Sequence, residues 1–314
     1  MHVTEHLAKA DRTLFSFEII PPPRGKNVRE IIDIVEQVAR VNPPFIDVTS
    51  HMAEAVYDEQ PDGTIQRRVR KKRPGTISIC GIIQNRYGID TVPHLLCTGF
   101  TREETEDAII ELNFLGIHNV LAIRGDETNY NKVLSQGRTR NVYAKDLVGQ
   151  VKDLRRARYL DTIANSEPMD FCIGVGGYPE THVESPNSKT DVRYLKEKVD
   201  AGADYIVTQM FFDNAVFHEF VRRCREAGIT VPIIPGLKLI DNARQLNSLP
   251  KHFHVTLPDD LVDEVLAAPD HAPEIGADWG RRQVEDLIAA GVECVHFYVM
   301  NDAGRVVDLV RKMV

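Results

Sequence analysis

Eight short apolar runs recur along the chain, and each is followed by a stretch in which the apolar residues have helical spacing. Runs of this kind, rich in Val, Ile, Leu and Phe, are typical of strands that are buried on both faces. They cover residues 14–20, 44–49, 91–97, 119–123, 170–177, 204–209, 231–236 and 292–299. Eight such strands alternating with helices fit a (β/α)8 TIM barrel better than an open sheet. We therefore predict an α/β barrel in one domain that spans residues 1–314.

The helical stretches fill the intervals between these strands. Helices are predicted over residues 28–41, 77–89, 103–115, 188–201, 214–227 and 303–314, and further helices begin near residues 143 and 241. The segments 261–267 and 281–290 add extra helices before the last strand. Thr101, followed three residues later by Glu104, forms the capping box expected at a helix start. Residues 127–140 are expected to form a polar loop.

The composition excludes several classes of protein. Apolar residues make up 43% of the chain and charged residues 27%, which is typical of a globular protein, and no apolar run is long enough to cross a bilayer. The first residues lack the basic region and apolar run of a signal peptide, so we expect a cytoplasmic location. The five scattered cysteines lack the paired spacing of zinc or iron–sulfur sites, so we expect no metal. The net charge of −8 argues against a nucleic-acid binder. We therefore expect neither a membrane nor a nucleic acid as partner.

The strand over residues 119–123 runs directly into Arg124, Gly125 and Asp126. In parallel α/β folds, ligands and catalytic groups gather at the carboxyl ends of the strands. We therefore take these three residues as the centre of a site. The alternative is an ordinary strand exit with an Arg–Asp pair on the surface.

Glu18 lies between apolar residues in the first strand. Burial of a carboxyl group raises its pKa and favours the protonated acid at neutral pH. The alternative is that strand alternation points Glu18 to solvent or into a salt bridge. His94 is read either as a site residue or as a satisfied core histidine. The Gln209 side chain either forms hydrogen bonds with the edge of a flat heterocycle or, at the end of its strand, forms hydrogen bonds with the backbone.

If the strands are consecutive in a barrel, polar residues from the first six converge on one face. These are Glu18, Thr49, His94, Asp126, Tyr178 and Gln209. The chain has no Walker, H-E-x-x-H or G-x-S-x-G sequence, so phosphoryl transfer, zinc hydrolysis and serine hydrolysis have no support. The glycines of residues 174–177 lack the spacing and the following helix of a dinucleotide fingerprint. The converging residues suit proton transfer beside a flat cofactor or substrate.

A basic run follows the second strand. It consists of Arg67, Arg68, Arg70, Lys71, Lys72 and Arg73. Such a run is usually a solvated face. As the alternative, its place after a strand puts it near the mouth of the barrel, where it can hold an anionic tail of a substrate.

Blocks along nearly the whole chain carry a resemblance to a known family. They cover residues 16–22, 93–97, 122–126, 178–182, 198–203, 208–213, 234–236 and 296–298. In order and spacing these blocks resemble the methylenetetrahydrofolate reductase family, the flavin-dependent barrel enzymes of one-carbon metabolism. The resemblance implies a catalytic domain of the bacterial type.

The resemblance also implies a reaction and its residues. FAD is expected as the bound cofactor, reduced by NADH, NADPH or another donor, and the reduced flavin then passes hydride to methylenetetrahydrofolate to give methyltetrahydrofolate. Glu18 matches the general acid that helps to open the five-membered ring of the folate. Asp126 matches a carboxylate that holds the pterin and favours the cation. Gln209 matches a residue that contacts folate and nicotinamide. With a folate as substrate, the basic run is expected to help hold its polyglutamate tail. The positions that match cofactor contacts are Thr49, His94, Arg124, Gly125, Asp126, Ala144, Tyr178, His182, Asp191 and Lys198.

Three departures from the family pattern leave cofactor contacts open. Ser50, His51 and Met52 replace a Tyr-Gly-Ala, Tyr194 and Glu197 replace an Asn and an Arg that serve the FAD phosphates in bacterial relatives, and Ala243 replaces a stacking aromatic residue.

Two other functions remain as alternatives. A Schiff-base barrel lyase would use Lys198 or Lys238, whereas a non-catalytic folate-binding or electron-transfer subunit would bind folate without turnover. We further expect a homo-oligomer, with an electron-donor protein as another partner.

Overall fold

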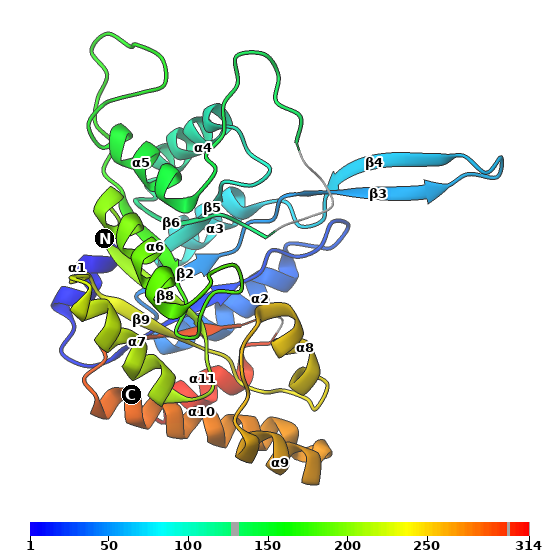
Figure 1. The fold of residues 1–314 in the computed structure, drawn as a ribbon, viewed down its shortest axis with the longest axis vertical. Helices are drawn as coiled ribbons and strands as arrows, with labels where there is room; N and C mark the ends of the chain where they lie inside the picture. Colours follow the sequence, from blue (N-terminus) through cyan, green and yellow to red (C-terminus); the bar gives the residue numbers. More distant parts are fainter. Residues whose placement is uncertain (127–131, 300–301, 314) are drawn as a thin grey trace.

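The computed structural model describes residues 1–126, 132–299 and 302–313, and Figure 1 shows its fold. Eight parallel strands form a closed barrel in the order β1-β10-β9-β8-β7-β6-β5-β2. The strands are β1 (Leu14–Ile19), β2 (Phe45–Val48), β5 (Asp90–Leu96), β6 (Asn119–Ile123), β7 (Cys172–Gly177), β8 (Tyr205–Met210), β9 (Ile233–Leu237) and β10 (Cys294–Tyr298). The ring closes where Leu14 pairs with Cys294 and Phe17 with Ile46. The predicted (β/α)8 barrel is confirmed.

Helices surround the barrel in the predicted intervals. They are α2 (Arg29–Val38), η1 (Ala39–Val41), α3 (Thr76–Tyr87), α4 (Arg102–Phe114), α5 (Ala144–Leu154), α6 (Ser188–Ala201), α7 (Asn214–Glu226) and α11 (Gly304–Arg311), with α8 (Gln245–Phe253), α9 (Asp259–Ala267), η2 (Pro269–His271) and α10 (Ala272–Ala289) before the last strand. The Thr101 capping box is formed as predicted. Residues 127–131 of the predicted loop and residue 314 of the predicted last helix lie outside the described residues. Within the described chain, no helix is both long enough and apolar enough to cross a bilayer.

Helix α10 begins nine residues before its predicted start at residue 281, at Ala272. The sequence hides this first half because Gly276 and Gly280 are weak helix formers. Packing explains both glycines. A Cβ atom at Gly276 would lie 2.1 Å from the carbonyl oxygen of Ile240, and one at Gly280 would lie 2.2 Å from a methyl group of Leu239.

Helix α1 (Val3–Lys9), which the sequence analysis did not predict, closes the amino-terminal end of the barrel. The Val3 amide donates a hydrogen bond of 2.8 Å to Asn119 Oδ1, and the terminal amino group pairs with Asp90 at 2.9 Å. Val3 and Leu7 pack on apolar side chains at that end, among them Phe45. The helix therefore seals one end of the lumen with hydrocarbon.

Most of the basic run lies in an antiparallel hairpin, β3 (Ala53–Glu59) and β4 (Ile65–Lys71), that projects from the barrel (Figure 1). Arg68 pairs across the hairpin with Asp58 at 2.7 Å, and Arg70 pairs with Glu54 at 3.6 Å. Part of the run is therefore neutralised within the hairpin, as expected of a solvated face.

Strand alternation decides what fills the lumen. On β1, Phe15, Phe17 and Ile19 belong to the apolar layer between the strands and the helices, so Ser16 and Glu18 face inward. The fully buried ring of Tyr205 on β8 also lies inside the barrel. It passes over Gly174 on the neighbouring strand, where a Cβ atom would lie 2.4 Å from Tyr205 Cζ. A glycine thus makes room for an inward-facing aromatic side chain.

Replacing Gly174 with alanine is expected to lower the free energy of unfolding by about 2 kcal/mol, because the buried Tyr205 ring cannot move away. Gly176, two residues further along β7, is the matched control, since its nearest neighbour would lie 3.9 Å from a new Cβ atom. Gly176→Ala should change the free energy by less than about 1 kcal/mol. Urea unfolding measures both variants, and equal effects would contradict the tight contact at Gly174.

Candidate active site

Glu18 lies near the carboxyl end of β1 and faces into the lumen. Its side chain is 15% exposed. Burial raises the pKa of the Glu18 carboxyl group to about 7, although the neighbouring His94 opposes part of this rise. The structure therefore favours a buried Glu18 over a solvent-facing one. With a pKa of about 7, roughly half of the Glu18 side chains are protonated at neutral pH.

His94 on β5 stands between two carboxyl groups. Its Nε2 atom lies 3.3 Å from Glu18 Oε2 and 3.7 Å from Oδ2 of Asp47 on β2. The side chain of His94 is 6% exposed, and burial lowers its pKa, so the imidazole is neutral near pH 7. A neutral ring nitrogen between two acids accepts a proton from either one.

Arg124, Gly125 and Asp126 leave β6 at the same end of the barrel that holds Glu18. Gly125 has a φ of 88°, a conformation that favours glycine. Asp126 is exposed, and Arg124 forms an ion pair of 2.6 Å with Glu184 in the loop after β7. The predicted acid and the predicted anion thus share one face of the barrel.

The loop after β7 places two aromatic side chains together. The rings of Tyr178 and His182 meet edge to face, with their centroids 4.4 Å apart. Asp191 near the start of α6 accepts hydrogen bonds from the His182 amide at 3.1 Å and from the Ser185 hydroxyl at 2.9 Å. These bonds fix the loop against α6. Burial raises the pKa of the Tyr178 phenol to about 12 and keeps it protonated.

Two lysines border this region. Lys198 on α6 donates a hydrogen bond of 2.5 Å to the carbonyl oxygen of Gly176, and burial lowers its pKa to about 8. Ala144 is the first residue of α5, and its neighbour Lys145 pairs with Glu197 of α6 at 2.7 Å. The expected cofactor positions on α5 and α6 therefore lie on adjacent helices that an ion pair joins.

Gln209 near the end of β8 accepts a hydrogen bond of 2.9 Å from the Met210 amide through its side-chain oxygen. This agrees with the backbone-bonded reading, and the side-chain amide nitrogen stays available to a ligand at the same time. Beside it, Tyr298 of β10 donates a hydrogen bond of 2.6 Å to the Thr208 carbonyl oxygen.

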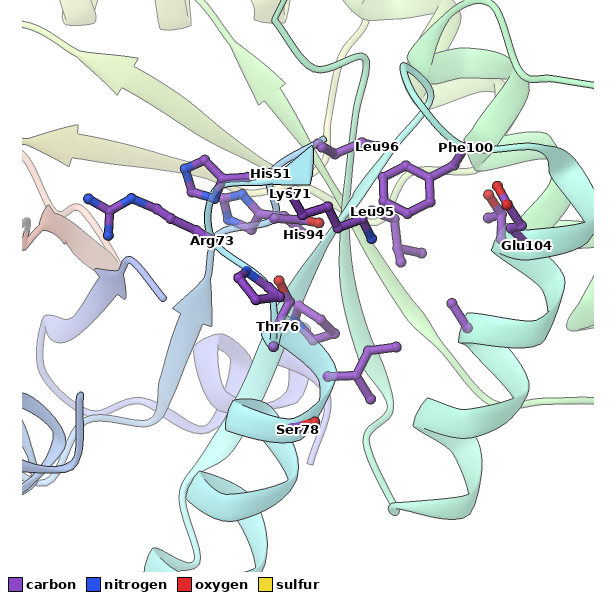
Figure 2. Close-up of a pocket in the computed structure, with 17 residues that line it drawn as sticks. His51, Lys71, Arg73, Thr76, Ser78, His94, Leu95, Leu96, Phe100 and Glu104 are labelled. Carbon is purple, nitrogen blue, oxygen red and sulfur yellow. The ribbon is translucent and has the colours of Figure 1, made fainter. Parts of the chain in front are cut away.

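A cavity of about 250 Å³ opens beside His94, between the end of β5 and the amino-terminal ends of α3 and α4 (Figure 2). His51, Lys71 and Arg73 bring basic groups to its wall, and the Lys71 amine lies 4.5 Å from the centre of the Phe100 ring. Lys71 and Arg73 come from the basic run, so part of this run does border the mouth of the barrel. Its binding of a polyglutamate tail stays a prediction.

Asp47 was not predicted as a site residue. It lies on β2, the strand between those of Glu18 and His94, and it pairs in register with Glu18. The spacing of two residues in the sequence could have indicated Asp47. Asp47 lies two residues before Thr49, and strand alternation puts both on the same face. The Thr49 hydroxyl is buried and, within the described chain, has no hydrogen-bond partner. Both side chains therefore belong to the inward face of β2.

The family model that describes methylenetetrahydrofolate reductase matches residues 2–313. A rice (Oryza sativa subsp. japonica) protein named as a probable methylenetetrahydrofolate reductase (NADH) is 30% identical, over 96% of this chain and 48% of its own length. The 5,10-methylenetetrahydrofolate reductase of Salmonella typhimurium is also 30% identical, over 92% of this chain and 86% of its own. The chain thus spans about half the length of the plant relatives and most of the bacterial one.

Solved structures share the fold at low sequence identity. A Clostridium thermocellum protein, described as binding two copies of 5-methyl-5,6,7,8-tetrahydrofolic acid, has a TM-score of 0.61 at 11% identity, over 99% of this chain and 98% of its own. Oxaloacetate acetylhydrolase has a TM-score of 0.51 at 11% identity, over 99% of this chain and 82% of its own. These similarities concern the barrel architecture.

The Glu18→Gln variant is expected to be more stable than the wild type, by a difference that grows as the pH rises from about 4.5 to about 7. Below about pH 4.5 the group is protonated in both the folded and the unfolded state. Between about pH 4.5 and about pH 7 the unfolded chain loses this proton first, so the wild type loses stability relative to Glu18→Gln, by up to about 3 kcal/mol. Urea unfolding across this range measures the difference. Glu111→Gln, at an exposed position on α4, is the control. A difference for Glu18→Gln that does not change with pH would contradict the buried acid.

Proposed function

This chain belongs to the methylenetetrahydrofolate reductase family, and we propose that it reduces 5,10-methylenetetrahydrofolate to 5-methyltetrahydrofolate with FAD as its bound cofactor. NADH, NADPH or another reduced donor supplies the electrons, and the names of its relatives include both nicotinamide donors. One observation carries the proposal. Glu18, at the position that the family resemblance gives to the acid, is buried at the active end of the barrel and has a pKa raised to about 7.

The residues at the mouth of the barrel suit a flavin. The buried Thr49 hydroxyl and His51 Nδ1 have no hydrogen-bond partner among residues 1–126, 132–299 and 302–313, so a bound ring with polar edges can satisfy them. The glycine at residue 125 lets a flat ring approach the backbone. Tyr178, His182 and Lys198 extend the same edge of the barrel toward α6.

Glu18 and Asp126 would divide the chemistry between them. Glu18 gives its proton to the ring nitrogen that leaves when the five-membered ring of the folate opens. The exposed carboxylate of Asp126 then favours the positive charge that develops on the methylene group. Gln209 orients the pterin with its side-chain amide. When bound, the flavin supplies the hydride that the methylene carbon takes up.

The departures from the family pattern change how the diphosphate of FAD would be held. Glu197 replaces a basic residue and would repel a diphosphate, but Lys145 pairs with it at 2.7 Å. The pair is on the surface, so it removes most of the local charge and supplies little attraction. We expect Lys198 and the amino-terminal end of α6 to carry more of the diphosphate contact in this chain.

The lysines of the alternative lyase are both engaged in the structure. Lys198 donates to the Gly176 carbonyl oxygen, and the 5%-exposed side chain of Lys238 pairs with Asp241 at 2.7 Å. A lysine that forms a Schiff base must be free to attack as the neutral amine. Neither geometry favours a lyase.

The experiment on the proposed function follows the colour of the flavin. Protein reconstituted with FAD should be yellow, lose its colour anaerobically with NADH, NADPH or reduced ferredoxin, and regain it when methylenetetrahydrofolate is added. A protein that binds folate but never returns the colour would instead support the non-catalytic subunit. A protein that cannot bind FAD would reject the proposal.

Glu18→Gln should separate the two half-reactions. Loss of the proton donor should slow reoxidation of the flavin by methylenetetrahydrofolate at least about 100-fold, within the usual range for a general acid. Reduction of the flavin by the donor needs no such proton and should stay within about twofold of wild type. Stopped-flow absorbance measures both rates, and an equal loss in both would refute the assignment of Glu18 as the acid.

A further inference from the structure

The lumen beneath Glu18 contains buried polar atoms that lack hydrogen-bond partners within the described part of the chain. They are both carboxyl oxygens of Asp47, the hydroxyl group of Tyr205, Nε2 of His296 and Nε2 of His94. Asp47, Tyr205 and His296 are fully buried. Buried polar groups are nearly always satisfied, by protein or by ordered water, because an unpaired one is costly. These atoms make the lumen polar and place proton donors and acceptors close to one another and to any ordered water there.

The barrel brings these groups together from opposite walls. Strands β2 and β8 face each other across the ring, so Asp47 and the Tyr205 phenol project toward the same axis. A TIM barrel is usually filled by branched apolar side chains, and here only the end next to α1 is filled in that way. Ser16, Asp47, His94 and His296 make the remaining layer polar.

The other polar side chains in this layer already have partners. Ser16 bonds to Nδ1 of His296 at 2.8 Å, and Tyr298 donates to the Thr208 carbonyl oxygen. His94 Nε2 lies 3.3 Å from Glu18 Oε2 and 3.7 Å from Asp47 Oδ2, and it has no hydrogen bond to either acid. One nitrogen is therefore placed to exchange a proton with two carboxyl groups.

We propose that Asp47 is a positioning residue for the acid: through His94 it holds a proton inside the lumen and returns it to Glu18. This rests on the proposed function, in which every turnover leaves Glu18 ionised. The proton leaves Asp47 Oδ2 for the free Nε2 of the neutral imidazole, and the same nitrogen passes it to Glu18 Oε2. Asp47 ends as the carboxylate, His94 returns to its neutral form, and Asp47 regains a proton from water when the product leaves.

The position of the three groups explains why an internal supply is useful. Folate and flavin bind at the open end of the barrel, so they cover Glu18 from the solvent side. The opposite end is closed by α1 and apolar side chains. The lumen is then the side from which Glu18 can still receive a proton. Burial raises the pKa of Asp47 well above its ordinary value, which favours its protonated form.

The titratable groups that face Asp47 come from every wall around it. They are Glu18 of β1, His94 of β5, Tyr205 of β8, Cys294, His296 and Tyr298 of β10, and Cys80 of α3. Burial keeps the phenols and thiols protonated and lowers the pKa of His296 to about 3, so none of them adds charge near pH 7. The exchange therefore involves the two carboxyl groups and His94.

The test is the pH dependence of flavin reoxidation by methylenetetrahydrofolate in single turnovers of the FAD-loaded protein. In the wild type the rate should fall above about pH 7 as Glu18 ionises. Asp47→Asn keeps the shape and removes the stored proton, so that an ionised Glu18 is no longer supplied with a proton from the lumen. The pH at which the reoxidation rate of this variant is half its maximum, the midpoint, should be lower by about one unit. Its rate should therefore be about tenfold below that of the wild type on the alkaline side and little changed on the acid side.

Asp107→Asn is the matched control, because it makes the same chemical change at an exposed position on α4. It should leave the midpoint in place, and reduction of the flavin by the donor should be unchanged in both variants. An unmoved or raised midpoint in Asp47→Asn, or a loss of rate that is equal at all pH values, overturns the proposal. If Asp47→Asn does not bind FAD, Asp47→Ser is measured against the same outcomes. A wild type that shows no folate-dependent reoxidation refutes the proposed function itself, so the two failures are distinct.

Discussion

Desolvation of the Glu18 carboxyl group is the constraint on which the proposed chemistry of this barrel depends. A carboxyl group in water is ionised at neutral pH, and only removal from water holds its proton until a leaving nitrogen takes it. The lumen supplies this environment while the end of β1 still reaches the mouth of the barrel. Asp126, at the end of the strand next to that of His94, is exposed instead. Burial therefore distinguishes these two acids of similar chemistry.

The barrel builds this environment from both of its ends. Helix α1 and a ring of apolar side chains close the amino-terminal end and exclude water there. Above that layer, glycines leave space for large inward-facing side chains, since Gly174 admits the Tyr205 ring and Gly236 admits the Tyr298 ring. The aromatic side chains and the polar groups between them then surround Asp47 and the lower side of Glu18. The same packing that closes the core therefore determines how the acid holds its proton.

Most of the fold follows from the sequence because each barrel strand is an apolar run bounded by polar turns. The features that could not be predicted were missed for physical reasons. The β3–β4 hairpin is exposed and charged, so it has no apolar period to detect. The first half of α10 was not predicted, because close contact with Ile240 requires a glycine at residue 276 and glycine is a weak helix former. Glu18 and Asp126 were found at the predicted end of the barrel. Asp47 was missed because its role depends on contacts across strands that only the closed ring creates.

The most direct measurement is a titration of Glu18 itself by ¹³C NMR, with the protein labelled at glutamate carboxyl carbons and the signal assigned by its loss in Glu18→Gln. The buried acid predicts a midpoint of about 7 for this one glutamate in the folded protein. A midpoint near the ordinary value of 4.5 would show a solvated carboxylate and would contradict a proton donor at this position.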